Sequence, residues 1–199
     1  LLIIGGSTMQ VRVQLTSASP MLMHNPTLAN PLHPLTKEFK ALTSKRGKTD
    51  DQLLDIMNLE FKGGLYCDAI LGPYIPDAVL LGAIRTAARG HKRGKDIERG
   101  VQILEDKIRL DYKGPRTPDE LYVAQEFTDV RRVVVDQGKT IMRCRPIFQT
   151  WTAQCTVVFD ESVLNKEQLV QFLEEAGTKA GIMDMRPRYG RFTAEVIRG

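Results

Sequence analysis

Apolar side chains recur along this chain with two periods, and the order in which the periods alternate restricts the possible folds. Alternation of apolar and polar residues predicts a half-buried strand at 10–16. Helical spacing follows at 77–89, and it is clearest at 164–180. Three further stretches have the composition or alternation of strands: 127–135, 150–159 and 192–197.

In chain order these elements are β-α-β-β-α-β, which is the order of the ferredoxin-like (RRM-like) fold in the α+β class. That fold places both helices on one face of a four-stranded antiparallel sheet. We expect one residue on each strand from the set Val13, Val133, Val157 and Ala194. Residues 17–75 are then a long insertion between the first strand and the first helix, with short helices predicted at 35–42 and 50–61. A single domain over 9–199, with 17–75 as an inserted subdomain, is the expected organisation.

Composition restricts the class of protein further. Hydrophobic residues make up 42% of the chain, and no stretch approaches the roughly 20 apolar residues that a membrane span requires. The apolar start is too short for a signal peptide, so we interpret residues 1–8 as a tag or a disordered start. The chain has three cysteines, Cys67, Cys144 and Cys155, and no CxxC pair. They predict neither a zinc site nor a disulfide framework, which favours a reducing, cytoplasmic location.

Positive charge is clustered along the chain. The net charge is +4 and the isoelectric point is about 9.0. Residues 85–99 contain six Lys and Arg against two acids, and residues 186–198 contain four Arg against one acid. Clustered cations are typical of a surface that binds a polyanion, although a solvated charged surface is the alternative.

The first cluster follows the stretch GPYIPDAVLLGAIRTAARGHKRG, residues 72–94. Asp77 is the expected N-cap of the helix, and its charge would oppose phosphate binding at the helix start. Arg85 and Arg89 lie four residues apart and therefore share one helix face. We expect phosphate contacts from these two arginines and from the basic tail that follows: Lys92, Arg93 and Lys95.

The second cluster lies in AGIMDMRPRYGRFTAEV, residues 180–196, which joins the last helix to the last strand. Gly190 is expected to allow close approach of a phosphate backbone, because glycine has no side chain. Tyr189 is expected either to stack on a base or to pack under the loop. Three arginines are expected to contact phosphates, with a plain turn as the alternative: Arg186, Arg188 and Arg191.

Both stretches resemble motifs of the RAMP superfamily, the repeat-associated proteins that form the backbones of CRISPR effectors. GPYIPDAVLLGAIRTAAR resembles the Y-I-P-G-S-S-L-K-G-x-L-R-like opening of that family's first helix, and MRPRYGRFTAEV resembles its glycine-rich loop before the last strand. The chain departs from the family at Asp77 and Ala78, where Gly-Ser is usual, and at Leu81, where lysine is common. It also departs at Asp184 and Met185, where the family often has glycines. A virus-encoded (phage) or stand-alone relative fits these motifs as well as a CRISPR subunit does.

The charge pattern and the resemblance together predict a non-catalytic protein that binds single-stranded RNA, with single-stranded DNA as the alternative. The segment 85–95 and the loop 186–191 would form one groove. A basic turn would add a mobile arm: Lys45, Arg46 and Lys48. The resemblance also implies assembly with copies of the chain or with related subunits, and no metal or cofactor is expected.

Two other functions are compatible with the same sequence. A viral structural or assembly protein would use the fold for protein contacts, and its basic surfaces would be incidental. A RAMP-type ribonuclease is the third hypothesis, in which His24 of the stretch PMLMHNP acts as a general base.

Overall fold

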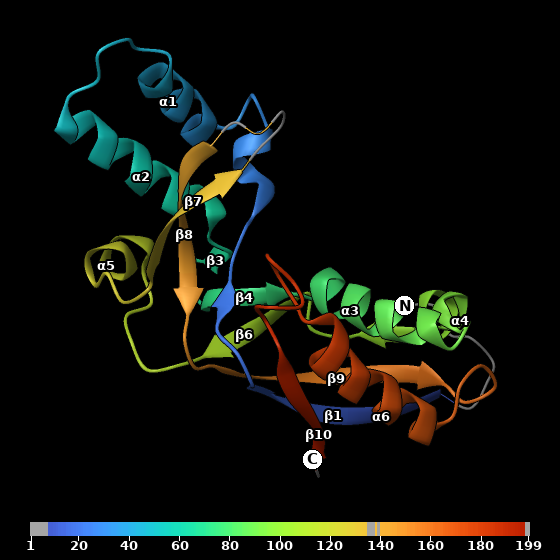
Figure 1. Ribbon diagram of the computed structural model, residues 1–199. Helices are drawn as coiled ribbons and strands as arrows, with labels where there is room; N and C mark the ends of the chain where they lie inside the picture. The colour runs from blue at the N-terminus through green and yellow to red at the C-terminus, as the bar shows by residue number, and fades with distance from the viewer. Residues whose placement is uncertain (1–7, 135–137, 139, 198–199) are drawn as a thin grey trace. The chain divides into compact units, whose positions relative to one another are not determined.

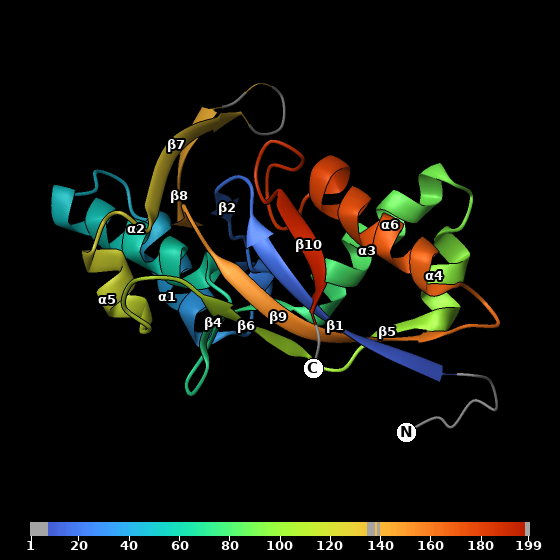
Figure 2. The same cartoon turned by 90° about the horizontal axis from the view of Figure 1, so that it is seen from below.

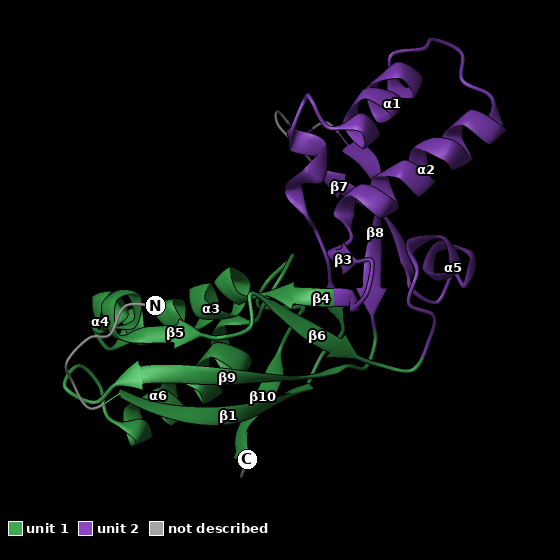
Figure 3. Cartoon of the chain, turned by 180° about the vertical axis from the view of Figure 1, so that it is seen from behind, with its two compact units in different colours: residues 1–21, 74–113, 149–199 green, residues 22–73, 114–148 purple. Residues whose placement is uncertain are grey.

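The computed structural model of the chain describes residues 8–134, 138 and 140–197 (Figure 1). The chain divides into two compact units, which we describe separately (Figure 3). Unit 1 comprises residues 1–21, 74–113 and 149–199, and unit 2 comprises residues 22–73 and 114–148. Of the predicted tag or disordered start, residues 1–7 lie outside the described residues, and Thr8 already belongs to a strand.

Unit 1 contains an antiparallel sheet in which β1 lies between β10 and β9, and β5 and β6 pair with the other edge of β9. This order, β10-β1-β9-β5, is that of a ferredoxin-like sheet. The end of β4 extends the sheet by pairing with β6. The strands are β1 (Thr8–Ser17), β4 (Gly72–Pro76), β5 (Val101–Ile103), β6 (Lys107–Asp111), β9 (Thr152–Asp160) and β10 (Phe192–Ile197).

Helices cover one face of this sheet (Figure 2). They are α3 (Asp77–Gly90), α4 (Gly94–Gly100) and α6 (Lys166–Glu175), and α6 continues into one π-helical turn, η3 (Ala176–Ala180). The apolar stripes of the two long helices are fully buried, with Leu80 on α3 and Leu169 on α6 at 0% exposure. Each such side chain contributes roughly 1.5–3 kcal/mol to folding. The α+β, ferredoxin-like fold predicted from the element order is therefore confirmed.

The two long helices of unit 1 are joined at one end by polar contacts. His91 follows α3, and its Nε2 lies 3.0 Å from both carboxylate oxygens of Glu175 on α6. The His91 ring also packs at 5.4 Å from the ring of Phe172. The hydrogen bond with His91 and, to a smaller extent, the one with Lys179 lower the pKa of Glu175 to about 2. This contact fixes the segment that carries the basic tail.

Unit 2 combines a three-stranded antiparallel sheet, in the order β2-β8-β7, with helices that pack on and around it. The strands are β2 (Met21–Leu22), β3 (Cys67–Asp68), β7 (Thr128–Val134) and β8 (Thr140–Phe148), of which β3 pairs with the start of β4. The helices are η1 (Pro26–Ala29), α1 (Pro34–Thr43), α2 (Asp50–Gly64) and α5 (Pro118–Val123). α2 packs against β8 and begins at a capping box of Thr49 and Gln52, in agreement with the predicted helix start.

Two expectations about the core are wrong. Val133 lies in β7, in the sheet of unit 2, so the second strand of the ferredoxin-like core is β5 rather than 127–135. The N-cap of α3 is Pro76, and Asp77 is the first helical residue, where its Oδ1 accepts a 2.6 Å hydrogen bond from the N–H of Ala78.

The expected insertion 17–75 largely coincides with the first segment of unit 2, and residues 114–148 are the second segment of that unit. The single-domain organisation stays a prediction.

Candidate nucleic-acid interface

The loop that follows η3, residues 181–191, is held in place by backbone hydrogen bonds; we call it the arginine loop. The N–H of Ile182 donates to the carbonyl of Gly190 at 2.9 Å, which closes the loop on itself. The N–H of Gly190 donates to the carbonyl of Pro20 at 2.8 Å, which ties the loop to the segment after β1. The loop therefore presents its side chains from a fixed backbone.

Gly190 is required by this backbone geometry. Its φ is +72°, in the left-handed region that glycine adopts without strain. A Cβ atom at this position would lie 1.9 Å from the carbonyl oxygen of Ile182. On the side where a Cβ would stand, the close approach at Gly190 is therefore made by the loop's own backbone, and the expected phosphate contact there stays a prediction.

The three arginines of the loop are exposed. The guanidinium of Arg188 lies 5.8 Å from the centre of the half-buried Tyr189 ring, within the range of a cation–π contact. Nε of Arg191 donates to the carbonyl of Pro187 at 2.7 Å, which orients that side chain along the loop. Within residues 8–134, 138 and 140–197, neither these two arginines nor Arg186 forms an ion pair with a carboxylate.

The second predicted patch, at the junction of α3 and α4, contains cations of two kinds. Arg85 binds Glu98 of α4 through Nη1 at 2.8 Å. Arg93 binds the carboxylate of Asp96 and donates from Nη2 to the carbonyl of Val163 at 2.7 Å, so it connects segments of the protein. The other three are exposed and form no ion pair in the described part of the chain: Arg89, Lys92 and Lys95.

The two patches lie at opposite ends of α3. The arginine loop is beside the start of the helix, and α4 is beyond its end (Figures 1 and 2). A helix of 14 residues is about 20 Å long. A strand that contacted both patches would therefore run the length of α3, over the small residues on its solvent side, Ala78, Gly82 and Thr86.

The basic turn predicted as an arm connects α1 and α2 in unit 2. Lys45 and Arg46 are exposed, and Gly47 has a φ of +62°. Nζ of Lys48 donates to the carbonyl of Lys45 at 2.6 Å. The turn therefore offers two outward-facing cations and one lysine that is bonded within the turn.

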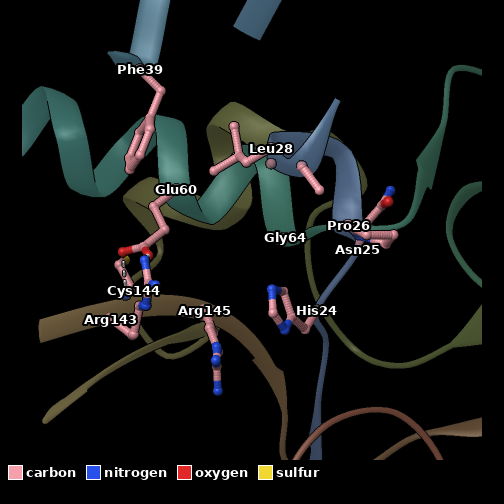
Figure 4. A pocket seen from close by; sticks show the side chains of 12 residues that line it. His24, Asn25, Pro26, Leu28, Phe39, Glu60, Gly64, Arg143, Cys144 and Arg145 are labelled. Carbon is pink, nitrogen blue, oxygen red and sulfur yellow. Dashed lines mark hydrogen bonds and ion pairs between the residues drawn. The ribbon is translucent and has the colours of Figure 1, made fainter. Parts of the chain in front are cut away.

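His24, the candidate general base, lines a pocket in unit 2 with a volume of about 350 Å³ (Figure 4). We call this the His24 pocket. Twelve residues line it: His24, Asn25, Pro26, Leu28, Ala29, Phe39, Glu60, Gly63, Gly64, Arg143, Cys144 and Arg145. The sequence interpretation missed every member but His24, because the lining comes from segments that are far apart in the chain. The one available signal was the spacing of the arginines in RCR, residues 143–145, which places both on the same side of a strand.

One side of the pocket is linked by polar contacts of Glu60. Nη1 of Arg143 lies 2.6 Å from Oε1 of Glu60, and the N–H of Cys144 donates to Oε2 at 2.9 Å. Burial raises the pKa of the Cys144 thiol to about 12, with smaller contributions from nearby carboxylates, so this thiol is protonated at neutral pH. In the described residues, no group of three or more His, Cys, Asp and Glu side chains is placed to hold a metal ion.

No protein-family model and no curated protein matches the chain. A chain in the cryo-EM structure of the type III-B Cmr-beta bound to cognate target RNA is similar, with a TM-score of 0.55 and 14% sequence identity. The likeness is one of fold. The alignment covers 96% of this chain and 61% of the Cmr-beta chain, so the present chain spans less than two thirds of its neighbour's length.

Across the described ranges, no helix is both long and apolar enough to cross a bilayer.

Proposed function

We propose that the protein binds single-stranded RNA, without cleaving it, as one subunit of a larger ribonucleoprotein. The arginine loop carries this proposal. It holds three exposed guanidinium groups on a backbone fixed by hydrogen bonds, and none of them is neutralised by a carboxylate in the described ranges. Guanidinium groups form strong bidentate contacts with phosphate, and a preorganised loop loses little conformational entropy on binding.

Two further observations support an RNA partner. The exposed cations at the far end of α3 would contact the same strand after it had followed the helix: Arg89, Lys92 and Lys95. The fold is similar to that of a chain in the structure of Cmr-beta bound to cognate target RNA. Association with copies of the chain or with related subunits belongs to the same proposal, and its basis is the resemblance of the two motifs to RAMP proteins.

Recognition in this proposal depends on phosphate contacts, and Tyr189 adds one stacking surface. Its ring is half-buried and lies next to the Arg188 guanidinium. Stacking on an aromatic ring tolerates any base, because every base has a π face. We therefore propose that the protein discriminates little between RNA sequences.

Replacing Arg186 and Arg188 together by alanine should weaken binding to single-stranded RNA of any sequence. Both side chains are exposed and neither forms an ion pair in the described residues, so the melting temperature should change little. Each lost phosphate contact should reduce the slope of log affinity against log salt by about 0.7. Fluorescence anisotropy with labelled oligouridylate and oligoadenylate measures both quantities.

The matched control removes two exposed cations from α1, in Lys37→Ala with Lys40→Ala. This variant has the same net charge as the loop variant and should retain most of the affinity. If the loop variant binds RNA as tightly as the wild type, or no more weakly than the control, the loop is a turn with solvated arginines and the proposal fails.

A further inference from the structure

We infer that the His24 pocket binds one nucleotide, with the phosphate group on its cationic side and the base on its apolar side. This site lies wholly within unit 2 and shares no residue with the arginine loop. The inference therefore stands or falls separately from the proposed role of that loop.

The size and lining of the pocket fit a small organic phosphate. A volume of about 350 Å³ is within the usual range for sites of small molecules, roughly 300–1,000 Å³. Such sites combine a mostly apolar lining with a few polar groups that fix the orientation of the ligand. The His24 pocket has this composition, because its lining includes His24, Glu60 and two arginines, four apolar side chains and the protonated thiol of Cys144; the apolar four are Pro26, Leu28, Ala29 and Phe39.

The cationic side is formed by Arg143, Arg145 and His24. The two arginines are two positions apart on β8, and Figure 4 shows Arg145 between Arg143 and His24. Two guanidinium groups and an imidazole thus line the same side of the pocket, and the carboxylate of Glu60 is bound to Arg143. Two arginines in one site are typical of phosphate recognition.

Glu60 is part of this arrangement, because it fixes Arg143. One of its oxygens binds the Arg143 guanidinium at 2.6 Å, and the other accepts from the N–H of Cys144 at 2.9 Å. Its side chain is only 12% exposed. Both oxygens thus have partners in the protein, and the carboxylate holds the guanidinium at the pocket instead of competing for a ligand's hydroxyl groups.

The apolar side explains why a nucleotide fits better than inorganic phosphate. Phe39 extends from α1 toward the pocket, and Leu28 lines it from η1 (Figure 4). Leu28 packs so closely on α2 that a Cβ atom at Gly63 would lie 2.6 Å from its Cγ, so its position is fixed by the helix backbone. A half-buried aromatic ring beside a firm apolar wall is a surface on which a base can stack.

Isothermal titration calorimetry with uridine 5′-monophosphate tests this inference on the full chain. Saturable binding is expected, and uridine and inorganic phosphate should each bind at least about tenfold more weakly, because each loses one half of the recognition. Arg145→Gln should lower the affinity for the nucleotide by about tenfold or more. Arg132→Gln, on the same hairpin but outside the pocket lining, is the matched control and should bind like the wild type.

A second variant, at Phe39, tests the same site in case Arg145→Gln does not fold. Phe39→Leu should lower the affinity for the nucleotide, because it removes the stacking surface. It should leave the weak affinity for inorganic phosphate unchanged. The loop variant Arg186→Ala with Arg188→Ala should bind the nucleotide like the wild type, which separates this site from the proposed RNA-binding loop.

A 5′-phosphorylated tetrauridylate distinguishes a free nucleotide from one within a strand. Either source supports the inference if its binding is lost in Arg145→Gln and retained in the Arg132→Gln control. The inference is overturned if neither the monophosphate nor the tetranucleotide binds in an Arg145-dependent manner, or if nucleoside and nucleotide bind equally.

Discussion

Gly190→Val is expected to lower the melting temperature of the protein by roughly 10 °C, which is a change of about 3–5 kcal/mol for a chain of this size. The φ of +72° is strained for a β-branched residue and costs about 1–3 kcal/mol. The new Cβ would also lie 1.9 Å from the carbonyl oxygen of Ile182 and 2.8 Å from its carbonyl carbon. Because both atoms belong to the backbone, no side-chain rotation relieves the clash, and the hydrogen bonds that close the loop must break.

Gly82→Val is the matched control for this substitution. Gly82 lies in α3, and no atom would lie within 4 Å of a Cβ placed there. Valine is a slightly better helix former than glycine, so the control should melt at or above the temperature of the wild type. Differential scanning fluorimetry measures both variants. A Gly190→Val protein that melts like the wild type would show that the loop backbone is not fixed, and the argument for preorganised arginines would lose its basis.

Glu60→Ala should destabilise the protein by about 3 kcal/mol, because it leaves a partly buried arginine and a buried N–H without their partner. The carboxylate is 12% exposed, and it binds both Arg143 and the backbone of Cys144. Removing one partner of a fully buried pair costs about 3–5 kcal/mol. We expect the lower end because the Arg143 side chain is 35% exposed and water partly compensates. Urea unfolding followed by circular dichroism measures the change.

Glu98→Ala provides the comparison, because it removes a carboxylate that binds an arginine at a similar distance but at an exposed site. The Arg85–Glu98 pair has an N–O distance of 2.8 Å, and the two side chains are 40% and 51% exposed. Exposed pairs contribute about 0–1 kcal/mol, so this variant should unfold close to the wild type. Equal losses in the two variants would mean that Glu60 contributes no more than a surface ion pair.

The parts of the fold that the sequence predicts are those encoded by local periodicity. The strand 192–197 and the helix at 50–61 follow from the spacing and type of their apolar residues, and the structure confirms both. β5 is only three residues long, which is too short for any periodicity to be visible. The hairpin strand β7 alternates as a core strand would, so nothing local distinguishes a core position for Val133 from one in unit 2.

In the candidate site too, the sequence predicts what neighbouring residues determine and misses what depends on distant segments. Charge clustering identifies the loop arginines, but it does not separate Arg93, which connects segments of the protein, from Arg89, which faces solvent. That distinction depends on the carbonyl of Val163, 70 positions away. The His24 pocket was out of reach for the same reason, because its arginines and its histidine meet only after the two segments of unit 2 have packed.

The salt dependence of binding between the wild-type protein and labelled single-stranded RNA tests the central proposal most directly. Fluorescence anisotropy should show binding at low salt, with log affinity falling linearly with log salt by about 0.7 for each phosphate neutralised. Nucleic acid should also copurify with the protein and raise its absorbance ratio at 260 and 280 nm. Protein that is free of nucleic acid, oligomerises and binds no RNA at low salt would contradict the proposal and favour an assembly role, and a salt-independent affinity would contradict binding through phosphate contacts.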